Sequence, residues 1–166
     1  MEMIVTSTSA MWFLPFVVPI SIWVAWSDMK FMKIPNKAVL ALFAVFVVVG
    51  LIALPLGEYP WRLLHLAVVL LIGLVLSTLG LLGAGDAKFA AAMAPFIALG
   101  DFGTLAYLMS AIVLASFVTH RTFKRIKVVR NLTPDWVSWE HRKFPMGLAL
   151  GSTLVAYLAL GAIYGA

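Results

Sequence analysis

Long apolar segments make up most of this 166-residue chain, and they restrict the folds open to it. Hydrophobic residues account for 63% of the sequence and charged residues for only 11%, whereas a typical soluble domain carries about 25% charged residues. At about 20 apolar residues per membrane span, the length accommodates six short helices and no additional soluble domain. The sequence therefore predicts an all-α polytopic membrane protein with a single transmembrane domain over residues 1–166.

Turn-forming residues separate the apolar segments and set the expected limits of the spans. We expect six helices, at Met11–Ser27, Ala38–Leu56, Leu63–Leu82, Ala87–Leu99, Phe102–Val118 and Phe144–Tyr164. The division between the fourth and fifth spans is the weakest, because a hydropathy window can fuse them. The fourth span would reach only roughly 20 Å across a hydrocarbon core of about 30 Å. This shortness predicts that Gly83–Asp86 lies in a water-accessible recess below the membrane surface.

The charged residues are distributed unevenly between the two predicted sides of the membrane. Of the 12 Lys and Arg residues, eleven fall in alternate loops, and only Arg62 falls on the other side, together with Glu2, Glu58 and Asp101. Because cytoplasmic loops are enriched in Lys and Arg, both termini are expected outside the cytoplasm. The same bias supports separate fourth and fifth spans. The net charge of +5 thus follows membrane topology, and no nucleic-acid partner is expected.

The longest loop, Thr119–Lys143, is predicted to be cytoplasmic, and its first half, His120–Arg130, is expected to form a basic helix on anionic headgroups. The absence of cysteine excludes disulfides, thiolate nucleophiles and cysteine-based zinc sites. His120 and His141 flank the loop but offer too few ligands for a metal. Residues Met1–Ala10 contain no Lys or Arg, so the first apolar segment is expected to be a retained span rather than a cleavable signal.

Two polar stretches interrupt the apolar sequence, Ser27–Asn36 and Gly83–Lys88, and each carries one aspartate. An ionisable residue at the edge of the hydrocarbon is costly and marks a functional site by default. Asp28 and Asp86 are both predicted at the cytoplasmic face. Two neighbouring carboxylates suit an aspartyl protease, in which the ionised member activates water and the protonated member polarises the scissile carbonyl.

Several of these residues also have structural interpretations. Asp86 follows a glycine and opens a helix, as an ordinary N-cap residue does, although Gly83 and Gly85 favour a close approach by another chain. Lys88 is more consistent with a side chain that extends to the headgroups. Asp101, in an outer turn, is expected to serve that turn only.

Asp28 ends the first span, where a carboxylate meets the negative end of the helix dipole. That position is unfavourable for a structural acid unless Lys30 or Lys33 neutralises it. The following Pro35 and Asn36 stop one helix and start the next, and their structural interpretation is a simple turn.

The two stretches in this order resemble the type IV prepilin peptidase family of GxGD aspartyl proteases. Its members pair Asp-x5-[Ile/Leu]-Pro-[Asn/Asp] with Gly-x-Gly-Asp-x-Lys, as in Asp28 to Asn36 and Gly83 to Lys88. The segment Phe144–Gly151 is similar to the Pro-x-Gly element that opens the last helix of the family. The resemblance covers nearly the whole chain and implies that Asp28 and Asp86 are catalytic. It further implies substrate-binding or site-shaping roles for Gly83, Gly85, Lys88, Pro35 and Asn36.

The family resemblance implies an endopeptidase that removes the short basic leader from type IV pilin-like precursors, without metal or organic cofactor. Cleavage is expected after a glycine at the cytoplasmic face of the bacterial inner membrane, just before the hydrophobic helix of the precursor. Bifunctional members carry two Cys-x-x-Cys pairs and also methylate the product. Since this chain has no cysteine, no methyltransferase activity is expected. In its size and its Ile34-Pro35-Asn36 turn it is most similar to the small peptidases of Flp/Tad pilus systems, with archaeal preflagellin peptidases next. The expected partners are prepilin precursors and the lipid bilayer.

Two other functions remain open from the sequence. A small cation-coupled transporter would use Asp28 and Asp86 to bind cations. Transporter sites usually lie near the bilayer midplane, whereas both aspartates are predicted towards one face, which favours the protease. A non-catalytic membrane subunit of a secretion machine would need neither carboxylate. The oligomeric state and the identity of the precursor are not determined.

Overall fold

The computed structural model describes residues 3–141 and 143–166 and consists of helices joined by short connections. No strand occurs within these residues, where a single bridge pairs Met3 with Gly165. Glu2 and Arg142, which the charge analysis assigned to opposite sides of the membrane, lie outside the described residues. The predicted all-α class is confirmed.

Within the described residues, seven α-helices follow one another. They are α1 (Ser7–Phe31), α2 (Asn36–Ala53), α3 (Tyr59–Thr78), α4 (Ala84–Met93), α5 (Phe102–Phe123), α6 (Lys127–Leu132) and α7 (Met146–Tyr164). Three 3-10 turns accompany them, η1 (Ala94–Phe96), η2 (Leu99–Asp101) and η3 (Val137–Trp139). The helices α1, α2, α3, α5 and α7 are long and apolar enough to cross a membrane. The chain is therefore a multi-pass membrane protein.

The fourth predicted span is shorter than a membrane-spanning helix. The ten residues of α4 extend about 15 Å, and the helix ends just before Pro95, which cannot donate a backbone hydrogen bond. The turns η1 and η2 complete the passage to Asp101, after which α5 begins. The fourth and fifth segments are thus separate, as the charge distribution required.

The basic segment after the fifth span differs from its prediction. Helix α5 continues to Phe123, beyond the expected end at Val118, and the chain turns before α6 begins at Lys127. The prediction of one basic helix over His120–Arg130 is therefore wrong. Its first part extends a spanning helix, where the backbone hydrogen bonds of α5 simply continue.

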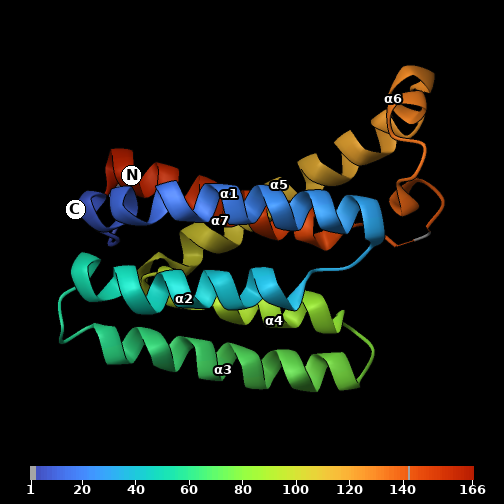
Figure 1. Cartoon of the computed structure of the whole chain (residues 1–166). Helices are drawn as coiled ribbons and strands as arrows, with labels where there is room; N and C mark the ends of the chain where they lie inside the picture. The colour runs from blue at the N-terminus through green and yellow to red at the C-terminus, as the bar shows by residue number, and fades with distance from the viewer. Residues whose placement is uncertain (1–2, 142) are drawn as a thin grey trace.

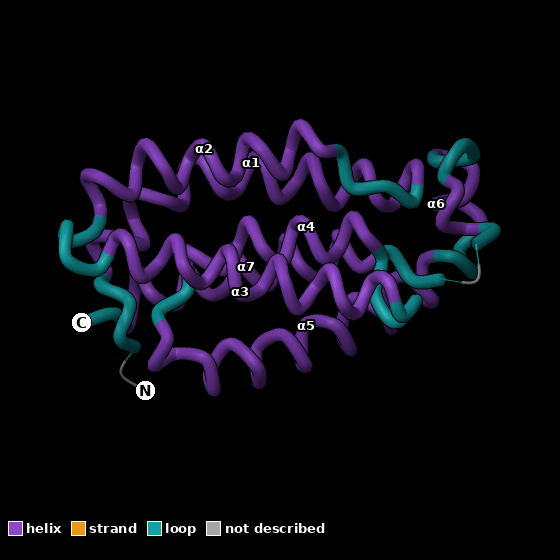
Figure 2. Tube along the Cα trace, turned by 90° about the horizontal axis from the view of Figure 1, so that it is seen from below, coloured by secondary structure: helices purple, strands orange, loops and turns teal. Residues whose placement is uncertain are grey.

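The long helices run back and forth along one axis (Figure 1). Both termini lie at one end, here called the termini end, where the Met3 N–H donates to the Tyr164 carbonyl at 3.1 Å and the Ala166 N–H donates to the Met3 carbonyl at 3.1 Å. The α1–α2 and α3–α4 connections and α6 lie at the opposite end, here called the aspartate end (Figures 1 and 2). Between its two termini, the chain therefore runs from one end of the bundle to the other six times.

Helix α1 holds the bundle together, because it packs most extensively on α7 and also contacts α2. Helix α3 packs on α4, and α5 packs on α7. In the core, the Phe96 ring meets Phe13 edge to face at 4.8 Å and Phe46 at 5.4 Å. These rings join α1, α2 and η1, and so fix the turn that follows α4 against the first two helices.

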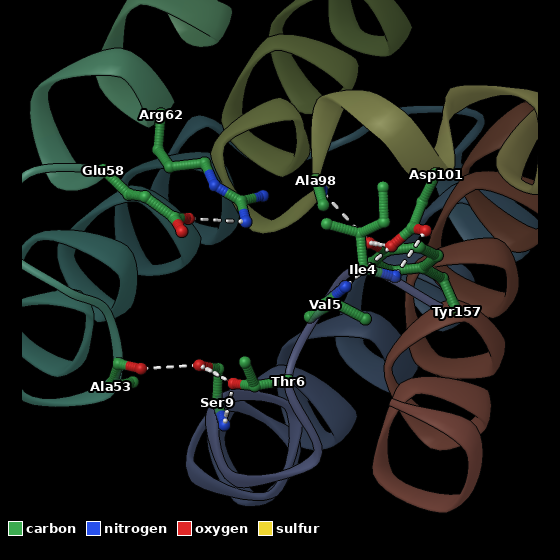
Figure 3. A network of polar contacts seen from close by, with 10 residues as sticks. All are labelled: Ile4, Val5, Thr6, Ser9, Ala53, Glu58, Arg62, Ala98, Asp101 and Tyr157. Carbon is green, nitrogen blue, oxygen red and sulfur yellow. Dashed lines mark hydrogen bonds and ion pairs between the residues drawn. The ribbon is translucent and has the colours of Figure 1, made fainter. Parts of the chain in front are cut away.

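Asp101 is a buried structural residue, and its prediction as a simple turn residue is wrong (Figure 3). Its carboxylate accepts hydrogen bonds from the backbone N–H groups of Ile4, at 2.8 Å, and Val5, at 2.9 Å. It also accepts from the Tyr157 hydroxyl at 2.7 Å, while that hydroxyl accepts from the Ala98 N–H at 3.0 Å. Asp101 therefore binds the N-terminal segment to η2 and α7, contacts that local sequence does not reveal.

Candidate active site

Asp28 lies in the last turn of α1, where the chain reverses towards α2. The helix ends at Met32, which adopts a left-handed conformation with φ 52° and donates its N–H to the Asp28 carbonyl at 2.9 Å. The Ser27 hydroxyl donates to the Lys33 carbonyl at 2.9 Å, and Pro35 precedes the first residue of α2. These contacts fold the Lys33–Asn36 segment back beside the end of α1.

The Asp28 side chain is buried, and its principal partner comes from the other end of the chain. The Gly147 N–H donates to Asp28 Oδ2 at 2.6 Å. Gly147 is the second residue of α7, so the positive end of the α7 dipole faces the carboxylate and favours its ionised form. Of the two lysines considered above, Lys30 lies over the Trp26 and Phe31 rings, and Lys33 lines the same cavity as Asp28.

Gly147 is a site residue that the list of candidates drawn from sequence did not include. A Cβ at this position would lie 2.9 Å from Asp28 Cβ and 3.0 Å from Oδ2, so only glycine permits this approach. The available sequence indication was the Pro-x-Gly element that opens the last helix. Its glycine serves the contact between α7 and Asp28.

Asp86 is the third residue of α4, and Gly83 is the N-cap, so the alternative interpretation of Asp86 as an N-cap residue does not hold. The carboxylate turns back towards Gly83, where a Cβ would lie 2.5 Å from Oδ2. At Gly85 a Cβ would lie 3.4 Å from Ile34 Cβ. The first turn of α4 therefore packs directly against the turn that follows α1, and the two polar stretches meet.

Asp28 and Asp86 line one cavity of about 380 Å³ at the aspartate end. Of the site-shaping candidates, Gly83, Gly85, Lys88 and Asn36 also line it. Pro35, which is the N-cap of α2, does not line it. The Lys88 ammonium donates to Asn36 Oδ1 at 3.4 Å, which links the two polar stretches. Lys143, Phe144 and Met146, at the start of α7 and just before it, complete the lining, and they were not among the site residues predicted from sequence.

The two carboxylates interact. Asp86 lies outside the five helices long enough to span the membrane, and its pKa is raised to about 6, first by burial and then by the Asp28 carboxylate. The Gly83 N–H and the Lys143 ammonium oppose the rise in this pKa. Asp86 therefore retains its proton to a much higher pH than an ordinary aspartate, beside an Asp28 that accepts a backbone N–H. Such a pair titrates as a unit.

His120 and His141 do not line the aspartate cavity. His120 is buried and stacks on Trp139 with ring centroids 5.1 Å apart, and neither it nor His141 lines the cavity. Across residues 3–141 and 143–166, no group of three His, Cys, Asp or Glu side chains is close enough to hold a metal ion.

Comparison with known sequences identifies one family. A sequence model of the type IV leader peptidase family matches residues 15–120. No curated protein and no solved structure matches the chain. The matched segment includes both aspartates, and it ends before α7 and its Gly147.

Proposed function

The chain belongs to the type IV leader peptidase family, and from this premise we propose that it is an aspartyl endopeptidase with Asp28 and Asp86 as the catalytic residues. Its substrates are type IV pilin-like precursors of the Flp type. It removes their leader peptide at the cytoplasmic face of the bacterial inner membrane. The family and the membrane helices support the general activity, and the precursor type follows from the sequence motifs.

The observation that carries the proposal is the shared cavity of the two aspartates. Asp28 closes α1 and Asp86 opens α4, yet both line one space of about 380 Å³. The Asp28 carboxylate contributes to the raised pKa of Asp86. Two acids that influence each other's protonation can share one proton, which is the condition for aspartyl protease chemistry.

The surroundings of the two acids support different roles. The Gly147 N–H donates to Asp28 and so favours an ionised Asp28, which acts as the base. Asp86 has a raised pKa and acts as the acid. A water molecule between them attacks the scissile carbonyl carbon while Asp28 takes a proton from that water. Asp86 donates its proton to the carbonyl oxygen, which gives a gem-diol intermediate. The C–N bond then breaks as the leaving amine takes the proton held by Asp28, and one gem-diol hydroxyl returns its proton to Asp86.

The arrangement supports a cation transporter less well. Carrier sites lie near the bilayer midplane on interrupted spanning helices. Here both aspartates lie at the aspartate end, beside the α1–α2 and α3–α4 connections (Figure 1). A single cavity at one end of the bundle suits a substrate that presents a peptide bond at the membrane surface.

The test is co-expression with an Flp-type precursor and mass measurement of the product. Asp28→Asn and Asp86→Asn should each reduce processing by roughly 100-fold or more, because an amide neither ionises nor donates an acid proton. Both variants should still insert into the membrane. Asp135→Asn, which alters an exposed aspartate of the basic loop, is the matched control and should process normally. Near-normal processing by either site variant would show that the altered aspartate is structural.

The same product mass reports on methylation. A product with an unmodified new N-terminus is expected, because the chain has no Cys-x-x-Cys pair. A mass increase of one methyl group in the presence of a methyl donor would contradict the assignment to the small peptidases.

A further inference from the structure

An apolar groove adjoins the aspartate cavity. It has a volume of about 310 Å³ and lies between α2 and α3, with α4 as its floor. Leu40 and Phe43 of α2 line one side and Leu70 of α3 lines the other, while Ala91 and Ala92 form the floor. Apart from Lys88, every side chain that lines it is apolar.

The packing of the three helices explains why the groove exists. Helices α2 and α3 each pack on α4 but make almost no contact with each other. They are joined towards the termini end, where the Tyr59 hydroxyl donates to the Val47 carbonyl at 3.0 Å and the Tyr59 ring stacks on Phe46 at 5.5 Å. Because the Ala91 and Ala92 side chains are small, they leave the space between α2 and α3 unfilled. Ala91 and Ala92 are each only 2% exposed, so an occupant of the groove would contact mainly the side chains of α2 and α3 that line it.

Lys88 connects the groove to the aspartate cavity, because it lines both. From Asp86, α4 runs past Lys88 to Ala92, a rise of roughly 9 Å. A peptide bond held at Asp28 and Asp86 is therefore less than two helical turns from the floor of the groove. A chain that continues from that bond along α4 reaches the groove.

We propose that this groove binds the first turns of the hydrophobic helix of the precursor, immediately after the scissile bond. The inference rests on the proposed peptidase function. The apolar walls match an apolar helix, and the groove leads from the cavity that would hold the bond. The weak and exposed contact between Lys88 and Asn36, 3.4 Å long, is the only hydrogen bond that the described residues form across this junction, and it opens at little cost.

A larger apolar cavity of about 790 Å³ provides the comparison. It is lined by residues of α1, α5, α6, η3 and α7, among them Ile22, Val155 and Met29, which directly follows Asp28. None of its lining residues also lines the aspartate cavity. Size alone would favour this space, but continuity with the two aspartates favours the groove over α4.

A matched pair of variants tests the proposal. Leu70→Trp fills the groove, whereas Leu71→Trp adds the same side chain to the neighbouring residue, which is exposed and lines neither the groove nor the aspartate cavity. Leu70→Trp should raise the KM for the full precursor by roughly tenfold or more, because the bulky ring displaces an apolar substrate side chain. It should leave cleavage of a soluble peptide that lacks the hydrophobic helix unchanged. Leu71→Trp should behave as wild type towards both substrates.

Two results would overturn the inference. One is that Leu70→Trp cleaves the full precursor as well as Leu71→Trp does. The other is that it loses activity equally on both substrates, because that pattern indicates damage to the catalytic site. Failure of the wild-type protein to cut any precursor would instead refute the proposed function, and the groove assignment with it.

Photo-crosslinking gives an independent measurement. A benzophenone side chain replaces Phe43 or Leu70 in full-length protein that also carries Asp86→Asn, in vesicles that contain the precursor. Crosslinks are expected to the first turns of the precursor helix. The same probe at Val155 reports on the larger cavity and should give none. Crosslinks at Val155 alone would place the helix there and overturn the proposal.

Discussion

Gly147 determines how closely α7 approaches Asp28. The Gly147 N–H donates to the carboxylate at 2.6 Å, and a Cβ would lie 2.9 Å from Asp28 Cβ. The backbone of one helix thus sets the position of an acid on another. A side chain at position 147 would push α7 and Asp28 apart.

Gly147→Ala is expected to reduce kcat by roughly 100-fold, because a displacement of about 1 Å at a catalytic group is sufficient for such a loss. The KM for the precursor should change little, because Gly147 does not line the groove proposed for the substrate helix. Steady-state kinetics on purified protein measure both parameters. Gly103→Ala is the control, because a Cβ at Gly103 meets nothing within 4 Å. Wild-type kcat in Gly147→Ala would contradict a positioning role for this contact.

Lys143 contributes to the pKa of Asp86. Its ammonium lowers the pKa of Asp86, against the larger effects of burial and of the Asp28 carboxylate, which raise this pKa to about 6. If Asp86 is the acid, kcat/KM falls as the pH rises through its pKa in the free enzyme. The alkaline limb of the profile should therefore have its midpoint near pH 6.

Lys143→Met removes the cation and should raise the pKa of Asp86 further, so the alkaline limb moves to higher pH. The pH dependence of kcat/KM measures this shift. Lys127→Met, in α6 and outside the aspartate cavity, is the control and should leave the limb in place. A shift to lower pH would mean that Asp86 is not the acid responsible for this limb.

At the scale of elements, the short α4 decides where Asp86 lies. Helix α3 comes so close to α4 that a Cβ on Gly73 would lie 3.0 Å from Ala87 Cβ. Ala87 directly follows Asp86, so the α3–α4 contact holds the first turn of α4 against the end of α1. The break before Pro95 then lets the chain return to α5 without a full-length span.

Asp101 joins elements at the termini end and should contribute stability rather than catalysis. Asp101→Ala leaves the N–H groups of Ile4 and Val5 and the Tyr157 hydroxyl without their acceptor. The expected cost in unfolding free energy is roughly 2–4 kcal/mol, seen as a lower melting temperature in detergent. The folded fraction should retain its kcat, because the aspartate cavity lies at the other end. Asp135→Ala, at an exposed position, should leave the melting temperature unchanged.

For the whole molecule, the six passages bring both termini to one end and both aspartates to the other. With the positive-inside rule, reporters fused after Lys33 and Arg125 should lie in the cytoplasm. Reporters after Glu58 and Ala166 should lie outside it. Alkaline phosphatase and fluorescent-protein fusions at these positions measure the orientation. A cytoplasmic C-terminus would contradict the predicted topology and the side on which cleavage is proposed.

The sequence alone determined the helical membrane architecture, because apolar length and the placement of lysine and arginine depend on local composition. It also selected Asp28 and Asp86 as candidates, because an acidic residue beside a long apolar segment can be recognised from the sequence alone. It misjudged Asp101, whose partners at Ile4, Val5 and Tyr157 are distant in the chain. An aspartate that is buried by distant partners cannot be told from an exposed turn aspartate by its neighbours in the sequence.

Only the tertiary structure decided what surrounds the two aspartates. The shared cavity, the Gly147 N–H on Asp28 and the groove beside Lys88 each depend on contacts between segments far apart in sequence. Hydropathy sets how many helices form and roughly where they end. Close packing then fixes which helices touch, and in this chain Gly73 permits a close contact between α3 and α4, and Gly147 one between α7 and α1.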